Sequence, residues 1–188
     1  MSSMDLIVGI DEVGRGSWAG PLVAAAVILN DQIEGLTDSK LLSANKRSKL
    51  SNDILITAKS YGIGWVSSQE IDLLGLTKSV SLAMKRAVEM INIEYQKIII
   101  DGNYNFLEDF DNVETLIKAD LLIPSVSAAS IIAKVARDQF MEEQSVLYPD
   151  YGFEKNVGYG TKQHLEALNK YGLTDLHRRS FKPMSLVF

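Results

Sequence analysis

The chain has 188 residues, of which 46% are hydrophobic and 23% are charged, which is typical of one folded domain of ordinary size. It has no cysteine, which excludes disulfides, thiolate metal sites and a cysteine nucleophile, and which fits a cytoplasmic location. The longest uncharged stretch, Gly16 to Asn30, has 15 residues and includes Pro21, so it is too short for a membrane span. The start of the chain also lacks the basic segment of a signal peptide.

The net charge of −5 argues mildly against a nucleic-acid partner, because proteins that bind polyanions usually carry a basic surface. The distribution of charge weakens that objection. Between Glu154 and Lys182 the sequence has six basic and three acidic residues, so this part is basic while the rest is acidic. Both histidines, His164 and His177, also lie there. The pattern fits a nucleic-acid surface and equally an ordinary solvated surface.

The first predicted strand, residues 6–10, is apolar on both faces, which is typical of a sheet covered by helices on either side. Alternate residues face opposite sides, so Val8 and Ile10 share one face while Gly9 and Asp11 share the other. The alternation of strands and helices along the chain predicts an α/β fold. Further strands are expected at 21–29, which forms a hairpin with the first, and at 61–67, 96–101 and 113–118, with helices at 44–59, 70–95 (with a break near Gly75), 125–147 and 161–171, and a loop at 150–160.

Acidic residues follow three of the predicted strands. Asp11 and Glu12 come after the first strand, Asp101 ends another, and Asp120 follows a third. In an open α/β sheet such strand ends can converge on one crevice. Carboxylates in apolar surroundings repel each other and need a positive partner, for which Arg15 and a metal ion are the candidates.

Oxygen ligands, with no thiolate and no suitably spaced histidine pair, favour magnesium or manganese over zinc. Two such ions about 4 Å apart would support phosphodiester hydrolysis. Taken alone, each aspartate also fits a turn former or a helix cap. The prediction of a metal site therefore depends on acidic residues recurring after three different strands. With four carboxylates present, the expected partner is metal, which leaves Arg15 free for substrate. Asp138 is expected to pair locally, and His164 and His177 are expected to be structural.

The segment Gly9 to Gly16, Gly-Ile-Asp-Glu-Val-Gly-Arg-Gly, resembles the opening signature of ribonuclease HII. The resemblance covers nearly the whole chain, and its motifs together are highly specific. The other matching motifs, in the family's order, are Ala19-Gly20-Pro21, Asp38-Ser39-Lys40, Asp101-Gly102, Ser127-Ala128-Ala129-Ser130-Ile131, Ala133-Lys134, Arg137-Asp138, Tyr151-Gly152-Phe153, Gly158-Tyr159-Gly160-Thr161 and His177-Arg178-Arg179-Ser180-Phe181.

The resemblance implies an RNase H-like mixed sheet flanked by helices over residues 1–147, and a small helical substrate-binding part over residues 148–188. It implies hydrolysis of the RNA strand of RNA/DNA hybrids, and nicking 5′ to single ribonucleotides embedded in duplex DNA. The products would carry 5′-phosphate and 3′-hydroxyl ends, and two Mg²⁺ or Mn²⁺ ions would assist. By motif position, the metal-binding and catalytic residues would be Asp11, Glu12, Asp101 and Asp120.

The resemblance also implies substrate-binding residues. Gly14, Arg15 and Gly16 fall on the family's loop that tests the ribose 2′-hydroxyl, and Tyr159 falls on the tyrosine that packs against the following deoxyribose. The chemistry agrees, because the 2′-hydroxyl distinguishes RNA from DNA and glycines leave room for backbone groups to reach it. An arginine can bind phosphate in a fork. Lys40 is expected to contact a backbone phosphate.

Three positions depart from the family pattern. Ser17-Trp18 stands where proline-leucine is more usual, Ala119 stands where glycine is common, and Val157 stands where a lysine often precedes Gly-Tyr-Gly. The absence of that lysine would weaken affinity rather than chemistry, and Trp18 is close enough to the sensing loop to affect substrate preference. None of these changes replaces a carboxylate.

Two alternatives to this function stay open. One is another nuclease of the same superfamily, such as a junction resolvase or the type of ribonuclease H that needs a run of ribonucleotides. The other is a non-catalytic nucleic-acid-binding module, which the basic C-terminal part suggests and the four carboxylates disfavour. The chain is expected to be a monomer. Its apolar tail, Met184 to Phe188, is expected to be a terminal strand on the core, with a sliding-clamp peptide as the alternative.

Overall fold

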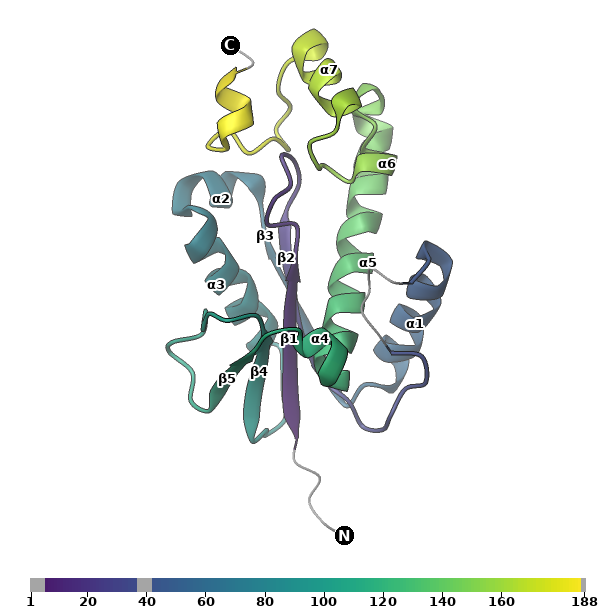
Figure 1. The fold of residues 1–188 in the computed structure, drawn as a ribbon, viewed down its shortest axis with the longest axis vertical. Coiled ribbons are helices and arrows are strands. Elements are labelled where there is room, and N and C mark those ends of the chain that lie inside the picture. The colour runs from purple at the N-terminus through teal and green to yellow at the C-terminus, as the bar shows by residue number, and fades with distance from the viewer. Residues whose placement is uncertain (1–5, 37–41, 187–188) are drawn as a thin grey trace.

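The fold is a mixed five-stranded sheet with helices on both faces (Figure 1). The strand order in the sheet is β3-β2-β1-β4-β5. The computed structural model describes residues 6–36 and 42–186, with side chains up to residue 184. The strands are β1 (Ile7–Val13), β2 (Leu22–Ile28), β3 (Ser60–Val66), β4 (Lys97–Asp101) and β5 (Val113–Leu116). The helices are α1 (Ala44–Thr57), α2 (Ser68–Leu74), α3 (Leu76–Val88), α4 (Ala119–Leu122), α5 (Pro124–Leu147), α6 (Phe153–Asn156) and α7 (Lys162–Tyr171), with 3-10 helices η1 (Pro149–Tyr151) and η2 (Lys182–Leu186).

The pairing of β1 decides where the acidic residues lie. β1 pairs with β2 in an antiparallel hairpin, whereas it pairs with β4 in parallel. Ile10 of β1 lies opposite Ile100 of β4, so the residues that follow them, Asp11 and Asp101, come side by side at the same edge of the sheet. The carboxyl ends of parallel strands share one edge, and this edge brings Asp11, Glu12 and Asp101 to one cavity.

Each face of the sheet is covered by a different pair of helices. α2 and α3 lie over one face, and α1 and α5 lie over the other (Figure 1). Val8 and Ile10 pack in the cluster that includes Val80 and Met84 of α3. On the other face, alternate residues of β2 pack in the cluster that includes Ala129 of α5. The alternation predicted for the first strand and the sheet covered on both sides are therefore confirmed.

Gly9 lets α5 approach the sheet closely. A Cβ atom on Gly9 would lie 2.2 Å from backbone atoms of Ser125 and Val126 in the first turn of α5. Any larger side chain would therefore push the helix away from β1. The close approach matters for the site because α5 also carries Ser130 and Lys134 toward the acidic edge of the sheet.

The C-terminal segments form a second small core at one end of the molecule. η1, α6, α7 and η2 surround the C-terminal half of α5 and the loop between β1 and β2 (Figure 1). Met141 of α5 and Ala19 of the loop are buried in the same cluster as residues of these segments. The buried members from the C-terminal segments are Tyr151, Phe153, Ala167, Leu168 and Met184.

Several expected element boundaries are wrong. β1 continues to Val13, so Asp11 and Glu12 lie within the strand, because they pair with Ala25 and Ala24 of β2. β5 ends at Leu116. The helix expected at 70–95 breaks at Gly75, as predicted, but ends at Val88. The segment expected as a loop at 150–160 contains short helical turns, and η2 forms where a terminal strand was expected at the tail.

Within residues 6–36 and 42–186, no helix combines the length and the apolar character needed to cross a bilayer.

Gly9→Ala should lower the free energy of unfolding by about 1–3 kcal/mol, because the added methyl group overlaps the backbone of α5. Gly16→Ala is the matched control, since nothing lies within 4 Å of its added Cβ, and its change should stay within about 0.5 kcal/mol. Urea unfolding followed by circular dichroism measures both. Equal midpoints for the two variants would contradict the assigned contact between Gly9 and α5.

Candidate active site

Three of the acidic residues expected in the site line one cavity of about 410 Å³ at the edge of the sheet. These are Asp11 and Glu12 of β1 and Asp101 at the end of β4. The remaining lining residues are Val13, Ser130, Lys134 and Tyr159. The cavity thus combines carboxylates from two strands with polar side chains from α5 and the C-terminal part.

Asp11 is the most strongly perturbed of these carboxyl groups. Burial raises its pKa to about 8, and the negative charges of Glu12 and Asp101 act in the same direction. A hydrogen bond from Ser130 and one from the amide N–H of Glu12, whose nitrogen lies 2.8 Å from Oδ1, lower the pKa only in part. Without a cation, the carboxylate form of Asp11 is therefore unfavourable.

The carboxylate of Glu12 is paired through one of its two oxygens. Its Oε1 accepts a hydrogen bond from Nη1 of Arg15 at 3.0 Å, whereas the buried Oε2 has no hydrogen-bond partner among the described residues. Burial raises the pKa of Glu12 and the contact with Arg15 lowers it. Arg15, which we expected to be free of the acidic cluster, pairs with Glu12 in the structure and lies 5.6 Å from the ring centre of Phe106.

Asp120 lies in a helix and not directly after a strand. β5 ends four residues earlier, and Asp120 is a buried residue in the first turn of α4. It is not among the residues that line the cavity. The residue before it, Ala119, contacts the site, because its amide nitrogen donates to Oδ1 of Asp101 at 2.7 Å. Ala119 is fully buried without a positive φ, so alanine fits where glycine is common in the family.

The cavity has the chemistry of a site for a divalent cation. The carboxyl groups of Asp11 and Glu12 both have raised pKa values, and one buried oxygen of Glu12 is unpartnered. A cation with oxygen ligands would relieve both conditions. Across the described ranges, no three acidic or histidine side chains already form a metal-binding group.

Gly14 and Gly16, two of the three glycines in the loop after β1, have different environments. Gly14 has φ 90°, and a Cβ there would lie 2.3 Å from Nε of Arg137, so packing inside the protein requires this glycine. A Cβ on Gly16 would meet nothing within 4 Å. Only Gly16 therefore leaves open space beside the loop, where a ligand can approach.

Two buried arginines that the sequence analysis did not assign hold this loop. Arg137 donates to the carbonyl oxygens of Pro21, Ala19 and Val157 at 2.8, 3.1 and 2.9 Å. Arg178 donates to the carbonyl oxygens of Gly20 and Arg15, the latter at 3.0 Å. Burial lowers the pKa of Arg178 to about 9, and the neighbouring Arg137 acts in the same direction. Their motifs were visible in the sequence, but nothing there distinguishes a buried arginine from a solvated one.

Tyr159 lies at the cavity and is 37% exposed, so its ring is accessible to a ligand. Its backbone is fixed on both sides, because its N–H donates to the carbonyl of Asn156 at 2.8 Å and its carbonyl contacts Nδ1 of His164 at 2.9 Å. Just before it, Val157 has φ 41°, an uncommon conformation for a branched residue. The carbonyl of Val157 accepts from Arg137, which helps to hold this conformation.

The remaining expectations concern residues at the margin of the site. Trp18 packs with its ring 5.5 Å from that of His164, on the C-terminal part. Asp138 pairs with Lys134 and Arg47, as the expectation of local pairing predicted. Lys40 lies outside the described residues.

The two histidines form a buried pair in the C-terminal core. Their Nε2 atoms lie 3.0 Å apart, and Nδ1 of His177 accepts a hydrogen bond from the amide of Thr174 at 2.9 Å. Burial lowers the pKa of both histidines, to about 4 for His177, where the charge of His164 adds to the effect. Both are therefore neutral near pH 7.

This pair should make stability depend on pH. The pKa of His177 is lower in the folded protein than the ordinary 6.5, so stability is full above pH 6.5 and falls as the pH decreases toward 4. Between pH 7.5 and 5, wild type should lose about 1–3 kcal/mol more than His177→Gln, which cannot take up the proton. Urea unfolding at both pH values measures this difference. Identical pH dependence of the two proteins would show that His177 is not the group responsible.

Comparison with known proteins agrees with this geometry. A sequence model of the family described as Ribonuclease HII matches residues 8–184. The ribonuclease HII of Coxiella burnetii (strain Dugway 5J108-111) is 44% identical over 181 residues, which cover 95% of this chain and 89% of the relative. That of Francisella tularensis subsp. novicida (strain U112) is 45% identical over 185 residues, covering 97% and 99%.

Solved structures give the same result. The ribonuclease H2 from Pyrococcus horikoshii OT3 superposes with a TM-score of 0.81 at 28% identity, covering 96% of each chain. The ribonuclease HII in the PCNA:RNase HII complex from Archaeoglobus fulgidus superposes with a TM-score of 0.76 at 26% identity, covering 94% of this chain and 95% of that one.

The sheet topology and the acidic cavity define an enzyme with an RNase H-like fold, of the metal-dependent hydrolase class. The chain belongs to the ribonuclease HII family. Membership of this family supports an activity that cleaves the RNA strand of RNA/DNA hybrids. The α/β fold and the enzyme class expected from the sequence are therefore both confirmed.

Proposed function

We propose that this enzyme hydrolyses the RNA strand of RNA/DNA hybrids and also nicks 5′ to single ribonucleotides in duplex DNA, leaving 5′-phosphate and 3′-hydroxyl ends. The observation that carries this proposal is the cavity in which Asp11, Glu12 and Asp101 lie together with Tyr159. The carboxylates would support the chemistry, and the aromatic ring with the adjoining loop would support recognition of the sugar.

Mg²⁺ or Mn²⁺ is the proposed cofactor, with Asp11, Glu12, Asp101 and Asp120 as the residues that would hold it. The raised pKa of Asp11 and the unpartnered Oε2 of Glu12 support a cation at this position. When bound, such ions activate water and neutralise charge on the reacting phosphate. Ser130 would keep Asp11 oriented through its hydrogen bond, and Ala119 would do the same for Asp101.

The loop after β1 is the proposed sensor of the ribose. Gly14 is needed for the shape of the loop, and the open space at Gly16 lets backbone groups reach a 2′-hydroxyl. Arg15, about half exposed, would exchange its contact with Glu12 for a phosphate oxygen. Tyr159 would pack against the following deoxyribose, and Lys40 is proposed to contact phosphate.

Asp11→Asn should abolish cleavage of a hybrid, by about 1,000-fold or more, because it removes a charged ligand of the proposed metal site. Hybrid binding should change less than about threefold. The thermal midpoint should not fall, since the variant removes a carboxyl group that burial destabilises in its charged form. Denaturing gels, fluorescence anisotropy and thermal melts measure these quantities. Asp53→Asn, at an exposed position on α1, is the control. Residual cleavage near the wild-type rate would show that the site is wrongly assigned.

The proposed substrate range predicts a specific pattern of products. A long RNA/DNA hybrid and a DNA duplex with one ribonucleotide should both be cut, the latter on its 5′ side, and an all-DNA duplex should stay intact, because only the first two offer a 2′-hydroxyl to the loop. End-labelled strands on sequencing gels give the positions. Cleavage of the hybrid alone would favour the second candidate, a ribonuclease H that needs a run of ribonucleotides.

The proposed partners extend beyond the substrate. A structural neighbour was solved as a PCNA:RNase HII complex, which supports a sliding clamp as a partner of this chain. Met184 at the start of the apolar tail is buried in the C-terminal core, so a clamp peptide would have to begin after it. We also propose that residues 148–188 act as the substrate-binding part and that the enzyme works as a monomer.

A further inference from the structure

The cavity that holds the carboxylates has one cationic side chain among its described lining residues, Lys134 of α5. The other lining groups are acidic, neutral or apolar. A nucleic-acid backbone that reaches Asp11 and Glu12 must overcome their negative potential, and a cation on the same wall would reduce it. Lys134 is therefore the residue of this cavity whose charge is complementary to a phosphate.

Among the described contacts, the ammonium group of Lys134 does not pair with Asp11 or Glu12. Ser130 and the amide of Glu12 lower the pKa of Asp11, and Arg15 lowers that of Glu12. The ammonium group of Lys134 instead lies 2.8 Å from Oδ1 of Asp138, one turn further along α5. It thus keeps two N–H groups that Asp138 does not use.

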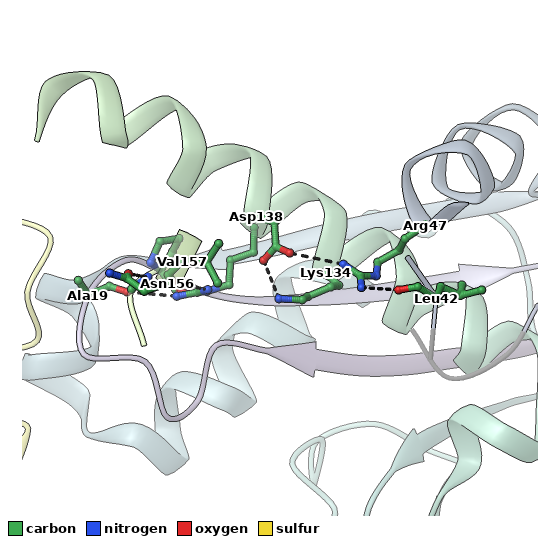
Figure 2. A network of polar contacts seen from close by, with 10 residues as sticks. Ala19, Leu42, Arg47, Lys134, Asp138, Asn156 and Val157 are labelled. Carbon is green, nitrogen blue, oxygen red and sulfur yellow. Dashed lines mark hydrogen bonds and ion pairs between the residues drawn. The ribbon is translucent and has the colours of Figure 1, made fainter. Parts of the chain in front are cut away.

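Asp138 forms ion pairs both with Lys134 of α5 and with Arg47 of α1. Its second oxygen lies 3.6 Å from Nη1 of Arg47, and Nη2 of Arg47 donates to the carbonyl of Leu42 at 2.9 Å. Figure 2 shows Asp138 between the two cations, with the contacts forming a line from α5 to α1. The side chains of Lys134 and Asp138 are 22% and 27% exposed, so the pair is partly shielded from water.

Lys134 and Asp138 are four residues apart on α5, with the lysine first. A lysine placed four residues before an aspartate on a helix gains only about 0.2–0.5 kcal/mol, and the reverse order is the better one. Helix stability alone is therefore a weak reason for this arrangement. Ser130, Lys134 and Asp138 are spaced four residues apart, so they lie on one side of α5, and the first two line the cavity.

We propose that Lys134 binds a phosphate of the substrate backbone beside the acidic cavity, and that Asp138, braced by Arg47, is the residue that positions it. The proposal rests on the proposed function, since it assigns a contact to the same substrate. Lys134 is a binding residue in this account, and Asp138 acts only through it.

Removing the charge of Lys134 should weaken substrate binding in a salt-dependent way. For Lys134→Met, KM for a hybrid should rise about tenfold while kcat stays within about threefold, since a charged hydrogen bond to phosphate is lost. The slope of log KM against log salt should fall by about 0.7–0.9, the change expected for one phosphate contact. Lys134→Arg should recover most of both effects. Thermal melts of each variant show whether it is folded.

Lys97→Met is the matched control. Lys97 also pairs with a carboxylate, that of Glu114 at 3.0 Å, but it begins β4 and so lies at the opposite end of the strand from Asp101. Its salt slope should equal that of wild type. If Lys134→Met also keeps the wild-type slope and KM, the proposed contact does not exist.

A double-mutant cycle tests the role of Asp138. Asp138→Asn should raise KM about fivefold in the wild-type background and less than about twofold in Lys134→Met, because Asp138 acts through the lysine. Equal effects in both backgrounds would overturn the positioning role. Failure of the proposed function is distinguishable, because in that case wild type itself would leave both ribonucleotide-containing substrates intact.

Discussion

Two buried guanidinium groups, those of Arg137 and Arg178, fix the geometry on which the site depends. Within the part of the chain that the structure describes, their hydrogen bonds reach no carboxylate, and they donate to carbonyl oxygens of the loop after β1. Burying a charge is costly, and several charge-assisted hydrogen bonds are needed to offset it. Because Arg137 comes from α5 and Arg178 from the C-terminal part, the loop, the long helix and the second core are held in one arrangement. The loop that we propose as the sensor of the ribose therefore has a defined position relative to β1.

The acidic cavity has the opposite character, because its charges are incompletely compensated. Parallel pairing of β1 with β4 brings Asp11 beside Asp101, and Glu12 lies next to both. Arg15 relieves only part of this charge. The folded protein thus keeps an unfavourable group of carboxylates at one edge of a well-packed sheet. A cation that binds there would stabilise the folded state as well as serve the reaction.

Local patterns predicted much of the fold and part of the site. The apolar residues of β1 predicted a strand covered on both faces, and Gly75 marked a real helix break. The expected boundaries were wrong where tertiary contacts extended or shortened an element. Pairing with β2 extends β1 past Glu12, and α4 begins before Asp120. Val157 in a left-handed conformation has no signal in the sequence, because a contact with distant Arg137 helps to hold it.

The sequence by itself determined which residue types were available. It specified the carboxylates, the glycines around Arg15, the absence of thiolates and the basic C-terminal part. These favour oxygen ligands for any metal ion and are compatible with a polyanionic substrate. Only the tertiary structure decided how they combine. It separated Gly14, which packing requires, from Gly16, which faces open space, and it turned Lys134 toward the acidic cavity. These distinctions depend on contacts between residues far apart in the chain, which no local pattern records.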